Sequence, residues 1–338
     1  MKYPKFLPKS GTIGVPAPSS GAYDKPHYNR YKNSKRKLEE KGYNVVLSKN
    51  IYKSEKCRSA SALERAKELE GMFENKEIDF IICAAGGEFL VEILPYINFE
   101  KIVKNPKFIL GHSDPTGFMY VLTTKYDIAT MYGNNFGDYG IENYDESILN
   151  NLKIISGNLI TQNSYKLYEE KGLPAITGLE GYNLTEKVCW KILNKCNKVE
   201  IKGRIIGGCL DLISELSGTK YDGTSEFIEK YSEDGIIWYF DNCDLSTEEL
   251  IRTMWKFNEM GYFKNAVGII FGRNGNNNSL LRYTFEEALI DSIISKLNIP
   301  IIYDADISHK GPNLTIINGA IATVKCENGK GNIKFDLY

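Results

Sequence analysis

Apolar and polar stretches alternate along the first 120 residues of the chain. The apolar runs predict strands at 12–16, 43–47, 79–84 and 107–110. The intervening polar or amphipathic stretches predict helices at 29–41, 61–75 and 88–95. Ser61 and Glu64 have the spacing of a capping box at the start of the second helix. Strands that alternate with helices indicate an α/β fold with a parallel sheet of doubly wound type.

The pattern changes after residue 140. Residues 140–200 show little periodicity, and we interpret them as the connection between domains. Beyond them, the sequence predicts strands at 200–206, 235–240, 267–271, 300–303, 315–318, 320–326 and 332–336. Helices are predicted near 210–217, 247–259 and 285–297, the last two opened by the capping pairs Ser246–Glu249 and Thr284–Glu287. The closing run of strands predicts a mixed or partly closed sheet.

These patterns predict two domains, as expected for 338 residues. We expect an N-terminal α/β domain with a doubly wound parallel sheet and a C-terminal α/β domain that is mainly β and barrel-like. The predicted boundaries are 1–150 for the first domain, 151–199 for the connection and 200–338 for the second domain.

Composition narrows the possible partners and the compartment. With 42 basic and 43 acidic side chains, the chain has no long-range attraction for nucleic acid or anionic lipid, so we expect neither as a partner. No apolar run approaches the length of a membrane span, and the N-terminus lacks the apolar stretch of a signal peptide. The seven scattered cysteines predict buried free thiols in a reducing compartment, which favours the cytoplasm. No cysteine or histidine pair has zinc-ligand spacing, so we expect no metal.

The most informative segment is FILGHSDPTG at 108–117. Its strand ends at Gly111, and a helix is predicted to start with Asp114 as N-cap and Pro115 at the first position. Ser113 then lies in the sharp turn at the carboxyl end of a strand, where open α/β sheets bind ligands. The N–H groups of a helix start are also suited to stabilising an oxyanion. The alternative is that Ser113 and Asp114 only cap the helix.

Three further loops carry candidate chemistry. Gly86 and Gly87 follow the strand at 79–84, where paired glycines either let the backbone approach a ligand or form a plain tight turn. His309 lies in a polar, glycine-containing loop past another strand, and Asp241 directly follows the strand at 235–240. Ser113, Asp241 and His309 together are a hypothetical nucleophile, acid and base, which only geometry can test.

The sequence resembles the serine carboxypeptidase family that contains the LD-carboxypeptidases of murein recycling and the microcin C immunity peptidases. The resemblance extends from about residue 10 to the carboxyl end. The blocks that carry it are GTIGVPAPSS, AAGGEFLVEILPYINFEKIVKNPKFILGHSDPTG, TMYGNN, GRIIGGCLDLISELSGTKYD, GIIWYFDNCDLS and DISHKGPNLTIINGA. Several spaced blocks in the family's order are far more specific than one motif.

The resemblance implies a role for several residues. Ser113 matches the nucleophile and His309 the base of this family. Gly86 and Asp114 match the positions whose backbone N–H groups form the oxyanion hole, and Gly87 lies beside them as a substrate-binding position. The resemblance further implies an enzyme without metal or cofactor, commonly a homodimer.

Two residues depart from the family's pattern. The family's acid is usually glutamate, whereas this chain has Asp241, which is one methylene shorter. His112 replaces the aromatic residue commonly found before the serine, and we interpret it as a packing or substrate-side residue. Two hypotheses follow. The first is a serine carboxypeptidase acting on a murein L,D-peptide, or alternatively on a peptidyl-nucleotide as in microcin immunity. The second is a small-molecule sensor that keeps the fold without a competent triad.

Overall fold

The structure is a computed structural model that describes residues 1–193, 196–280 and 282–337. The chain divides into two compact units. Unit 1 comprises Met1–Leu159 and Leu173–Tyr182, and unit 2 comprises Ile160–Gly172 and Asn183–Tyr338. The segment Ile160–Gly172 therefore belongs to unit 2, although it precedes the segment Leu173–Tyr182 of unit 1 in the sequence. Within the described residues, no helix has the length and apolar character needed to cross a membrane.

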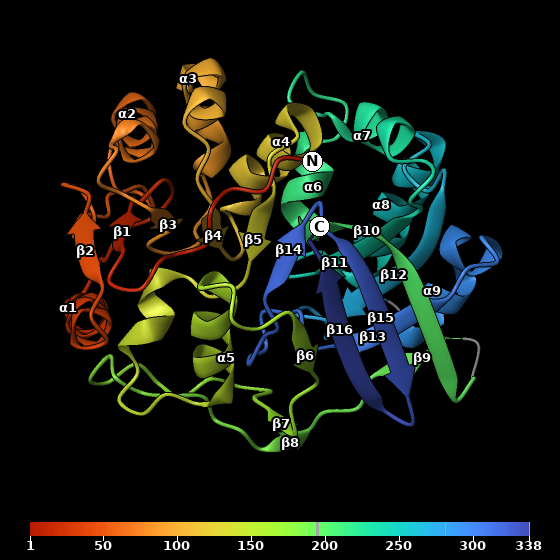
Figure 1. The fold of residues 1–338 in the computed structure, drawn as a ribbon. Coiled ribbons are helices and arrows are strands. Elements are labelled where there is room, and N and C mark those ends of the chain that lie inside the picture. The colour runs from red at the N-terminus through yellow and green to blue at the C-terminus, as the bar shows by residue number, and fades with distance from the viewer. Residues whose placement is uncertain (194–195, 281, 338) are drawn as a thin grey trace. The chain divides into compact units, whose positions relative to one another are not determined.

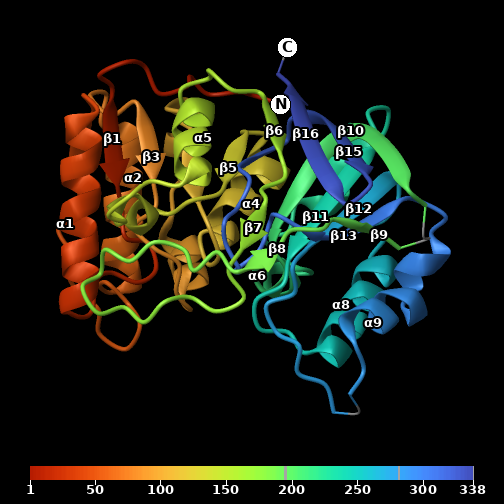
Figure 2. The same ribbon diagram turned by 90° about the horizontal axis from the view of Figure 1, so that it is seen from below.

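Unit 1 is built on a parallel sheet with strands in the order β5-β4-β3-β1-β2. Its elements are β1 (Thr12–Val15), α1 (Lys25–Glu40), β2 (Asn44–Leu47), α2 (Ala62–Glu74), β3 (Phe80–Ile82), the 3-10 helix η1 (Leu90–Tyr96), α3 (Phe99–Lys104), β4 (Ile109–Gly111), α4 (Thr116–Tyr126), β5 (Thr130–Tyr132), the 3-10 helix η2 (Phe136–Gly140) and α5 (Glu146–Ile155). Helices α2, α3 and α4 cover one face of this sheet, and α1 and α5 cover the other (Figures 1 and 2). The predicted doubly wound parallel sheet is confirmed.

Local sequence explains most of the elements of unit 1. Every residue of β3 and β4 is buried, as expected for apolar strands covered on both faces. The predicted capping box of Ser61 and Glu64 starts α2. Four elements were missed: β5, which is too short to show a period, the short helices α3 and η2, and α5, which Asp145 caps.

The expected N-cap role of Asp114 is wrong. Helix α4 begins at Thr116, Pro115 takes the N-cap position, and no side chain caps the helix. Asp114 instead turns its side chain into the interior of unit 1, where it is fully buried. The sequence has the pattern of a helix cap. In the structure, however, the Asp114 carboxylate accepts hydrogen bonds from the Ser19 hydroxyl and the Leu90 N–H instead of from the start of α4.

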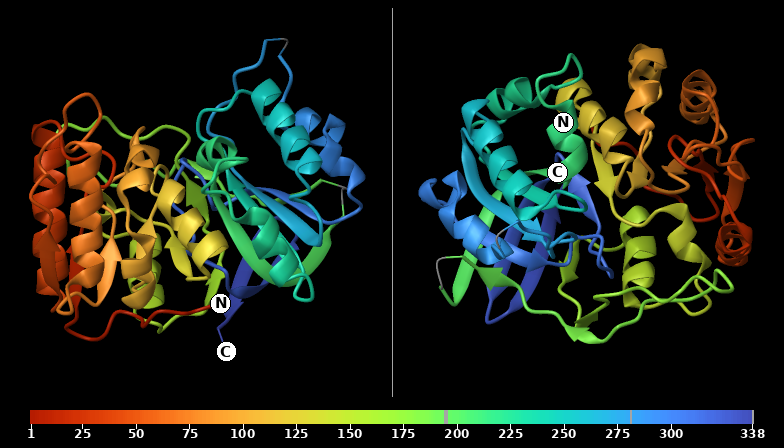
Figure 3. Two further views of the ribbon diagram at one scale, coloured as in Figure 1. Left: turned by 90° about the horizontal axis from the view of Figure 1, so that it is seen from above. Right: turned by 180° about the vertical axis from the view of Figure 1, so that it is seen from behind.

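Unit 2 contains a mixed sheet with strands in the order β6-β16-β15-β10-β11-β12-β13-β9. Its elements are β6 (Thr161–Asn163), β7 (Leu167–Tyr168), β8 (Glu186–Lys187), β9 (Lys191–Ile192), β10 (Lys198–Cys209), α6 (Leu210–Leu216), α7 (Thr224–Lys230), β11 (Ile236–Asp241), α8 (Thr247–Glu259), β12 (Ala266–Gly272), α9 (Phe285–Asp291), the 3-10 helix η3 (Ile293–Lys296), β13 (Ile301–Ala305), β14 (Ile316–Asn318), β15 (Ile321–Glu327) and β16 (Lys330–Asp336). Figure 3 shows α8 beside α9 next to this sheet.

The sheet of unit 2 is mixed, as predicted, but it is not a barrel. Strands β10 to β13 are parallel neighbours, whereas β15 and β16 form an antiparallel hairpin. Among the described strands, β6 and β9 pair with one neighbour each and stay at opposite edges, so the sheet is open. The run of closing strands in the sequence predicts strand content, but closure depends on pairing between distant edges, which local pattern does not encode.

Three smaller expectations are also corrected. The helix predicted over 285–297 divides at Ser292 into α9 and η3, and α7 was missed. The segment 140–200, for which no regular element was predicted, contains α5 and four short strands. The cysteines are not all buried, because Cys57, Cys189 and Cys196 are exposed.

Candidate active site

Ser113 lies in the sharp turn between β4 and α4 of unit 1. Its φ is 68°, in the left-handed region that residues other than glycine adopt rarely. A side chain held in that conformation needs support from its surroundings, and such residues cluster at functional sites. The predicted sharp turn is therefore present, and its backbone has the conformation expected where a side chain is aimed at a ligand.

Gly86 lies directly against Ser113. A Cβ atom on Gly86 would be 2.9 Å from the Cβ of Ser113 and 3.2 Å from its Oγ, so only glycine fits here without displacing the serine. Gly87 has a φ of 148°, and a Cβ atom there would be 2.3 Å from the Oγ of Ser19. Both positions of the glycine pair thus require glycine for close backbone approach.

The two predicted oxyanion-hole N–H groups are available for hydrogen bonding. In the part of the chain that the structure describes, neither the Gly86 nor the Asp114 backbone N–H donates a hydrogen bond. An N–H group without a protein acceptor beside a serine hydroxyl is suited to an oxygen that becomes negatively charged. The turn after β3 and the turn after β4 can therefore each offer one N–H donor to such an oxygen.

Asp114 connects three loops of unit 1. Its Oδ2 accepts hydrogen bonds from the Ser19 hydroxyl and, at 2.9 Å, from the Leu90 backbone N–H. Burial raises the pKa of this carboxyl group, and the two hydrogen bonds oppose that effect. Through these contacts Asp114 joins the turn that carries Ser113 to the loops around Ser19 and Leu90, which lie next to the glycine pair.

His112 is held through its backbone. Its N–H donates to Asn135 Oδ1 at 3.0 Å, and its carbonyl accepts from Asn135 Nδ2 at 3.1 Å. The His112 ring lies 5.0 Å from the Tyr132 ring, centroid to centroid, and the Ser113 N–H donates to the Tyr132 hydroxyl at 3.4 Å. The sequence reasoning missed the roles of Tyr132 and Asn135, although both lie in the TMYGNN block that carries part of the family resemblance.

Asp241 and His309 come together in unit 2. Asp241 is the last residue of β11, and His309 lies in the loop that follows β13. His309 Nδ1 lies 3.0 Å from Asp241 Oδ1, and the Asp241 side chain is fully buried. Because a carboxylate only accepts hydrogen bonds, the proton lies on Nδ1 and Nε2 is left as the basic atom. Aspartate, although shorter than glutamate, reaches the imidazole.

Two opposing effects set the protonation of His309. Burial by itself lowers the pKa of the imidazole, whereas the charge and hydrogen bond of Asp241 raise it. The attraction to Asp241 outweighs burial, and the pKa of His309 lies well above its ordinary value. Cys243 also contacts the ring and contributes to this rise, a neighbour that the sequence reasoning missed.

The segment that follows Asp241 is anchored by a residue at another strand end. Asp211, at the start of α6, accepts hydrogen bonds from the backbone N–H groups of Cys243, Asp244 and Leu245 at 3.0, 3.0 and 3.2 Å. Three donors on one carboxylate fix the path of the chain immediately after Asp241. The same rule that selected Asp241, a polar residue where a parallel strand ends, would also have selected Asp211.

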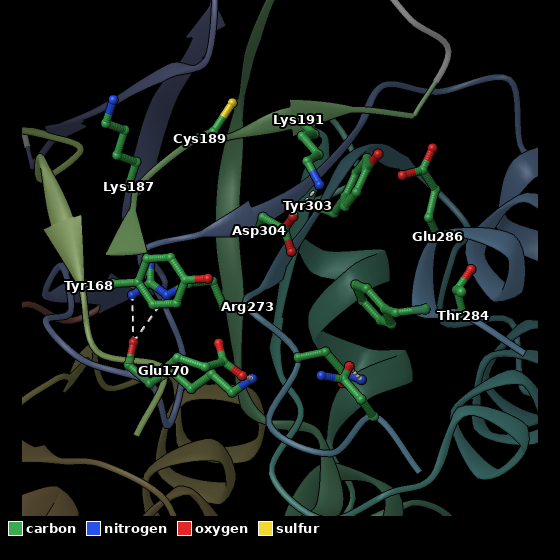
Figure 4. Close-up of a pocket in the computed structure, with 14 residues that line it drawn as sticks. Tyr168, Glu170, Lys187, Cys189, Lys191, Arg273, Thr284, Glu286, Tyr303 and Asp304 are labelled. Carbon is green, nitrogen blue, oxygen red and sulfur yellow. Dashed lines mark hydrogen bonds and ion pairs between the residues drawn. The ribbon is translucent and has the colours of Figure 1, made fainter. Parts of the chain in front are cut away.

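A cavity of about 420 Å³ opens in unit 2 next to the histidine loop (Figure 4). It is lined by Tyr168, Glu170, Lys187, Cys189, Lys191, Arg273, Asn274, Asn277, Thr284, Phe285, Glu286, Tyr303, Asp304 and Lys310. Lys191 pairs with Asp304 at 2.9 Å and Lys310 pairs with Glu170 at 2.6 Å, so both signs of charge line the wall. A wall of paired charges and aromatic rings suits a polar ligand.

Both units match one enzyme family. Residues 13–133 match the LD-carboxypeptidase N-terminal domain, and residues 202–324 match the LD-carboxypeptidase C-terminal domain. A probable murein peptide carboxypeptidase of Bacillus subtilis is 26% identical over 326 residues, which cover 95% of this chain and 91% of that protein. The microcin C7 self-immunity protein MccF of Escherichia coli is 26% identical over 310 residues, which cover 89% and 86%.

Solved structures show the same fold. An MccF-like protein from Bacillus anthracis superposes with a TM-score of 0.84 at 22% identity, covering 100% of both chains. MccF in complex with aspartyl sulfamoyl adenosine superposes with a TM-score of 0.82 at 22% identity, covering 100% of this chain and 99% of that one.

Replacing Gly86 by alanine tests the contact between the glycine turn and the serine. The new methyl group would press on Ser113, and we expect labelling of the serine by a fluorophosphonate to slow by about 10²-fold or more, because displacement of about 1 Å is enough for such a loss. Gly71→Ala in α2 is the matched control, since nothing lies within 4 Å of its added methyl group. Equal labelling of the two variants would contradict the close contact.

Replacing Asp114 tests whether it is a buried anchor or a helix cap. Asp114→Ala leaves the Leu90 N–H and the Ser19 hydroxyl without their acceptor, so we expect a loss of about 2–4 kcal/mol in the free energy of unfolding. Asp145→Ala, which removes the N-cap of α5, is expected to cost only about 1 kcal/mol. Urea unfolding measures both, and equal costs would support the cap interpretation.

Proposed function

Since the chain belongs to the LD-carboxypeptidase family, we propose that it is a serine carboxypeptidase that hydrolyses an amide bond near a free carboxyl terminus, an L,D-bond of murein peptides. The family predicted from the sequence blocks is confirmed, and serine peptidase chemistry accords with it. The murein substrate is favoured by the Bacillus subtilis relative, which carries a murein peptide carboxypeptidase name along 95% of this chain.

The observation that carries the proposal is the left-handed Ser113 packed against Gly86. A serine that only capped α4 would donate or accept a hydrogen bond at the helix start, yet α4 has no side-chain cap. Instead its backbone is held in an uncommon conformation, with two N–H groups beside it that donate to no described residue. That combination supports a nucleophile with an oxyanion hole.

In the proposed reaction, the Ser113 Oγ attacks the carbonyl carbon of the scissile amide while His309 Nε2 takes the hydroxyl proton. The carbonyl oxygen becomes negative and accepts hydrogen bonds from the Gly86 and Asp114 N–H groups. His309 then gives the proton to the leaving amine, which produces an acyl-serine ester. Water attacks this ester by the same route and releases the acid. Asp241 keeps the proton on Nδ1 and stabilises the imidazolium that forms.

A second candidate is hydrolysis of a peptidyl-nucleotide, as in microcin immunity. MccF is a relative along most of the chain, and its solved structure includes a complex with an aminoacyl sulfamoyl nucleoside. The same serine chemistry serves both substrates, because each has an amide bond next to a terminal group. Incubation with a murein tetrapeptide and with a peptidyl-nucleotide, followed by mass spectrometry of the products, decides between them.

We also propose a cytoplasmic homodimer that uses no metal or cofactor. The scattered cysteines support a reducing compartment, and the family resemblance supports the dimer. A peptide or peptidyl-nucleotide is the expected ligand, with Gly87 and His112 on the substrate side. Size-exclusion chromatography with light scattering measures the assembly, and a monomer at micromolar concentration would contradict it.

Ser113→Ala tests the nucleophile. We expect turnover and fluorophosphonate labelling to be lost while the melting temperature stays close to that of the parent, because no hydrogen bond of the Ser113 hydroxyl to a described residue is lost. Turnover within tenfold of the parent would exclude Ser113 as nucleophile. If the parent itself resists the probe and cleaves neither substrate, the sensor hypothesis is favoured.

Asp241→Asn tests the acid through the pH profile. The base must be neutral, so in the parent the rate rises with pH through the raised pKa of His309. Without the aspartate charge, burial dominates and the inflection should move to lower pH, while the plateau falls by about 10²- to 10⁴-fold. Asp241→Glu should keep most activity because it restores the family's residue.

The control for Asp241 is its exposed neighbour Asp244. Asp244→Asn is expected to change neither the plateau nor the inflection, since the hydrogen bonds that Asp244 makes with the described residues Asp211 and Asn276 use its backbone, which the substitution keeps. A profile that depends on Asp244 and not on Asp241 would reassign the acid.

A further inference from the structure

Arg273 lies between the acid and the base of the candidate site. Strand β12 pairs with β11 on one side and with β13 on the other. Its carboxyl end therefore lies between the end of β11, which carries Asp241, and the end of β13, which leads to the His309 loop. Arg273 is the first residue after β12, and it is 4% exposed. A buried guanidinium at this point must be compensated by its neighbours.

The guanidinium group of Arg273 binds the histidine loop directly. Its Nε and Nη2 donate to the carbonyl oxygen of Lys310 at 3.1 and 2.6 Å, and Nη2 also donates to the carbonyl oxygen of Pro312 at 3.0 Å. Lys310 is the residue after His309, so the guanidinium group is hydrogen-bonded to the backbone of the loop one residue away from the imidazole. In Figure 4 Arg273 lies behind the ring of Tyr168, whose centroid is 4.7 Å from the guanidinium carbon.

Asp306 fixes the other end of the same loop. Its Oδ1 lies 2.5 Å from Arg273 Nη1, and its Oδ2 accepts from Trp190 Nε1 at 2.9 Å and from the Tyr165 N–H at 3.2 Å. Burial raises the pKa of Asp306, and the charge of Arg273 opposes this effect. The buried pair therefore joins the loop to the core of unit 2 on both sides of His309.

Asn274, the residue after Arg273, contacts the segment that follows Asp241. Asn274 Oδ1 accepts a hydrogen bond at 2.6 Å from Asn242, the residue after Asp241. Two consecutive residues at the end of β12 thus contact the residue after the acid and the residue after the base. The 3.0 Å contact between Asp241 and His309 depends on the relative position of these two loops.

We propose that Arg273 is a positioning residue for His309: its guanidinium fork, anchored by Asp306, sets the distance and orientation of the imidazole relative to Asp241. This inference rests on the proposed function for its effect on turnover, but the geometry of the pair in unit 2 is independent of any substrate. Lysine cannot replace arginine here, because a single ammonium group that pairs with Asp306 does not also reach both carbonyl oxygens.

The experiment compares Arg273→Lys with Arg204→Lys. Arg204 is a matched control in the same unit: it is 9% exposed, pairs with Asp234 at 2.6 Å and donates to the Gly319 carbonyl, in contacts that do not involve either loop. For each variant, kcat and KM are measured, together with the melting temperature and the titration of the His309 ring by NMR. With only three histidines in the chain, a His309→Gln spectrum assigns the signal.

We expect Arg273→Lys to lower kcat by about 10- to 10²-fold with KM changed less than about twofold, since the substrate is bound but the base is misplaced. The pKa of His309 should fall towards its ordinary value as the contact with Asp241 loosens. Among the described residues of unit 2, Asp241 and Cys243 are titratable groups that contact the ring and raise this pKa. Arg204→Lys should leave kcat and the His309 titration unchanged.

Two results would overturn the inference. One is an unchanged His309 titration in a folded Arg273→Lys variant. The other is an equal loss of kcat in both arginine variants, which indicates general destabilisation. If Arg273→Lys does not fold, Asp306→Asn replaces it, because the amide oxygen still accepts from Trp190 and Tyr165 while the charge on Arg273 loses its partner; the same titration shift is then required.

The proposed function and this inference fail separately. If the parent shows neither turnover nor labelling, the proposed function is wrong, yet the titration of His309 still tests the positioning by Arg273. If the parent is active and the titration does not move, only the inference is wrong.

Discussion

A buried carboxylate must have hydrogen-bond donors around it, and this constraint organises the candidate site. Asp114, Asp241 and Asp306 are all fully buried. Removing a carboxylate from water without compensation costs several kcal/mol, so each one draws donors from separate parts of the chain. Asp114 draws on the loops around Ser19 and Leu90, Asp241 on His309, and Asp306 on Arg273. These contacts join loops that are far apart in the sequence.

The parallel strands of both sheets bring the candidate site residues of each unit to one edge of its sheet. Parallel strands end on the same edge of a sheet, so residues far apart in sequence meet there. In unit 1, Gly86 follows β3 and Ser113 follows β4, and these strands are neighbours. In unit 2, Asp241 ends β11, whereas Arg273 and His309 follow β12 and β13, and these three strands are neighbours. Rigid strands and compensated carboxylates together give the precision that nucleophilic catalysis needs.

Much of this was predictable from sequence. The periodic runs predicted most strands and the capping boxes of α2, α8 and α9, because these depend on residues close together in the chain. The sequence blocks identified the family, and the rule that ligands bind at strand ends selected Ser113 and Asp241. The same rule, applied to the strand that ends before Arg273, would have selected that residue as well. Its charge directly after an apolar run was the available signal.

The sequence by itself determined most of the strands and helices in their order, the family and which residue types stand at the strand ends, since each follows from local pattern or from motifs. Tertiary structure alone decided what those residues touch. Asp114 looked like a cap and is a buried anchor, because its donors come from 24 and 95 residues away. The 3.0 Å contact of Asp241 and His309 joins residues that are 68 positions apart in the sequence. The hydrogen bond from Arg273 to the Lys310 carbonyl joins residues that are 37 positions apart. Such contacts arise from sheet pairing and from the compensation of buried charge, neither of which a local pattern records.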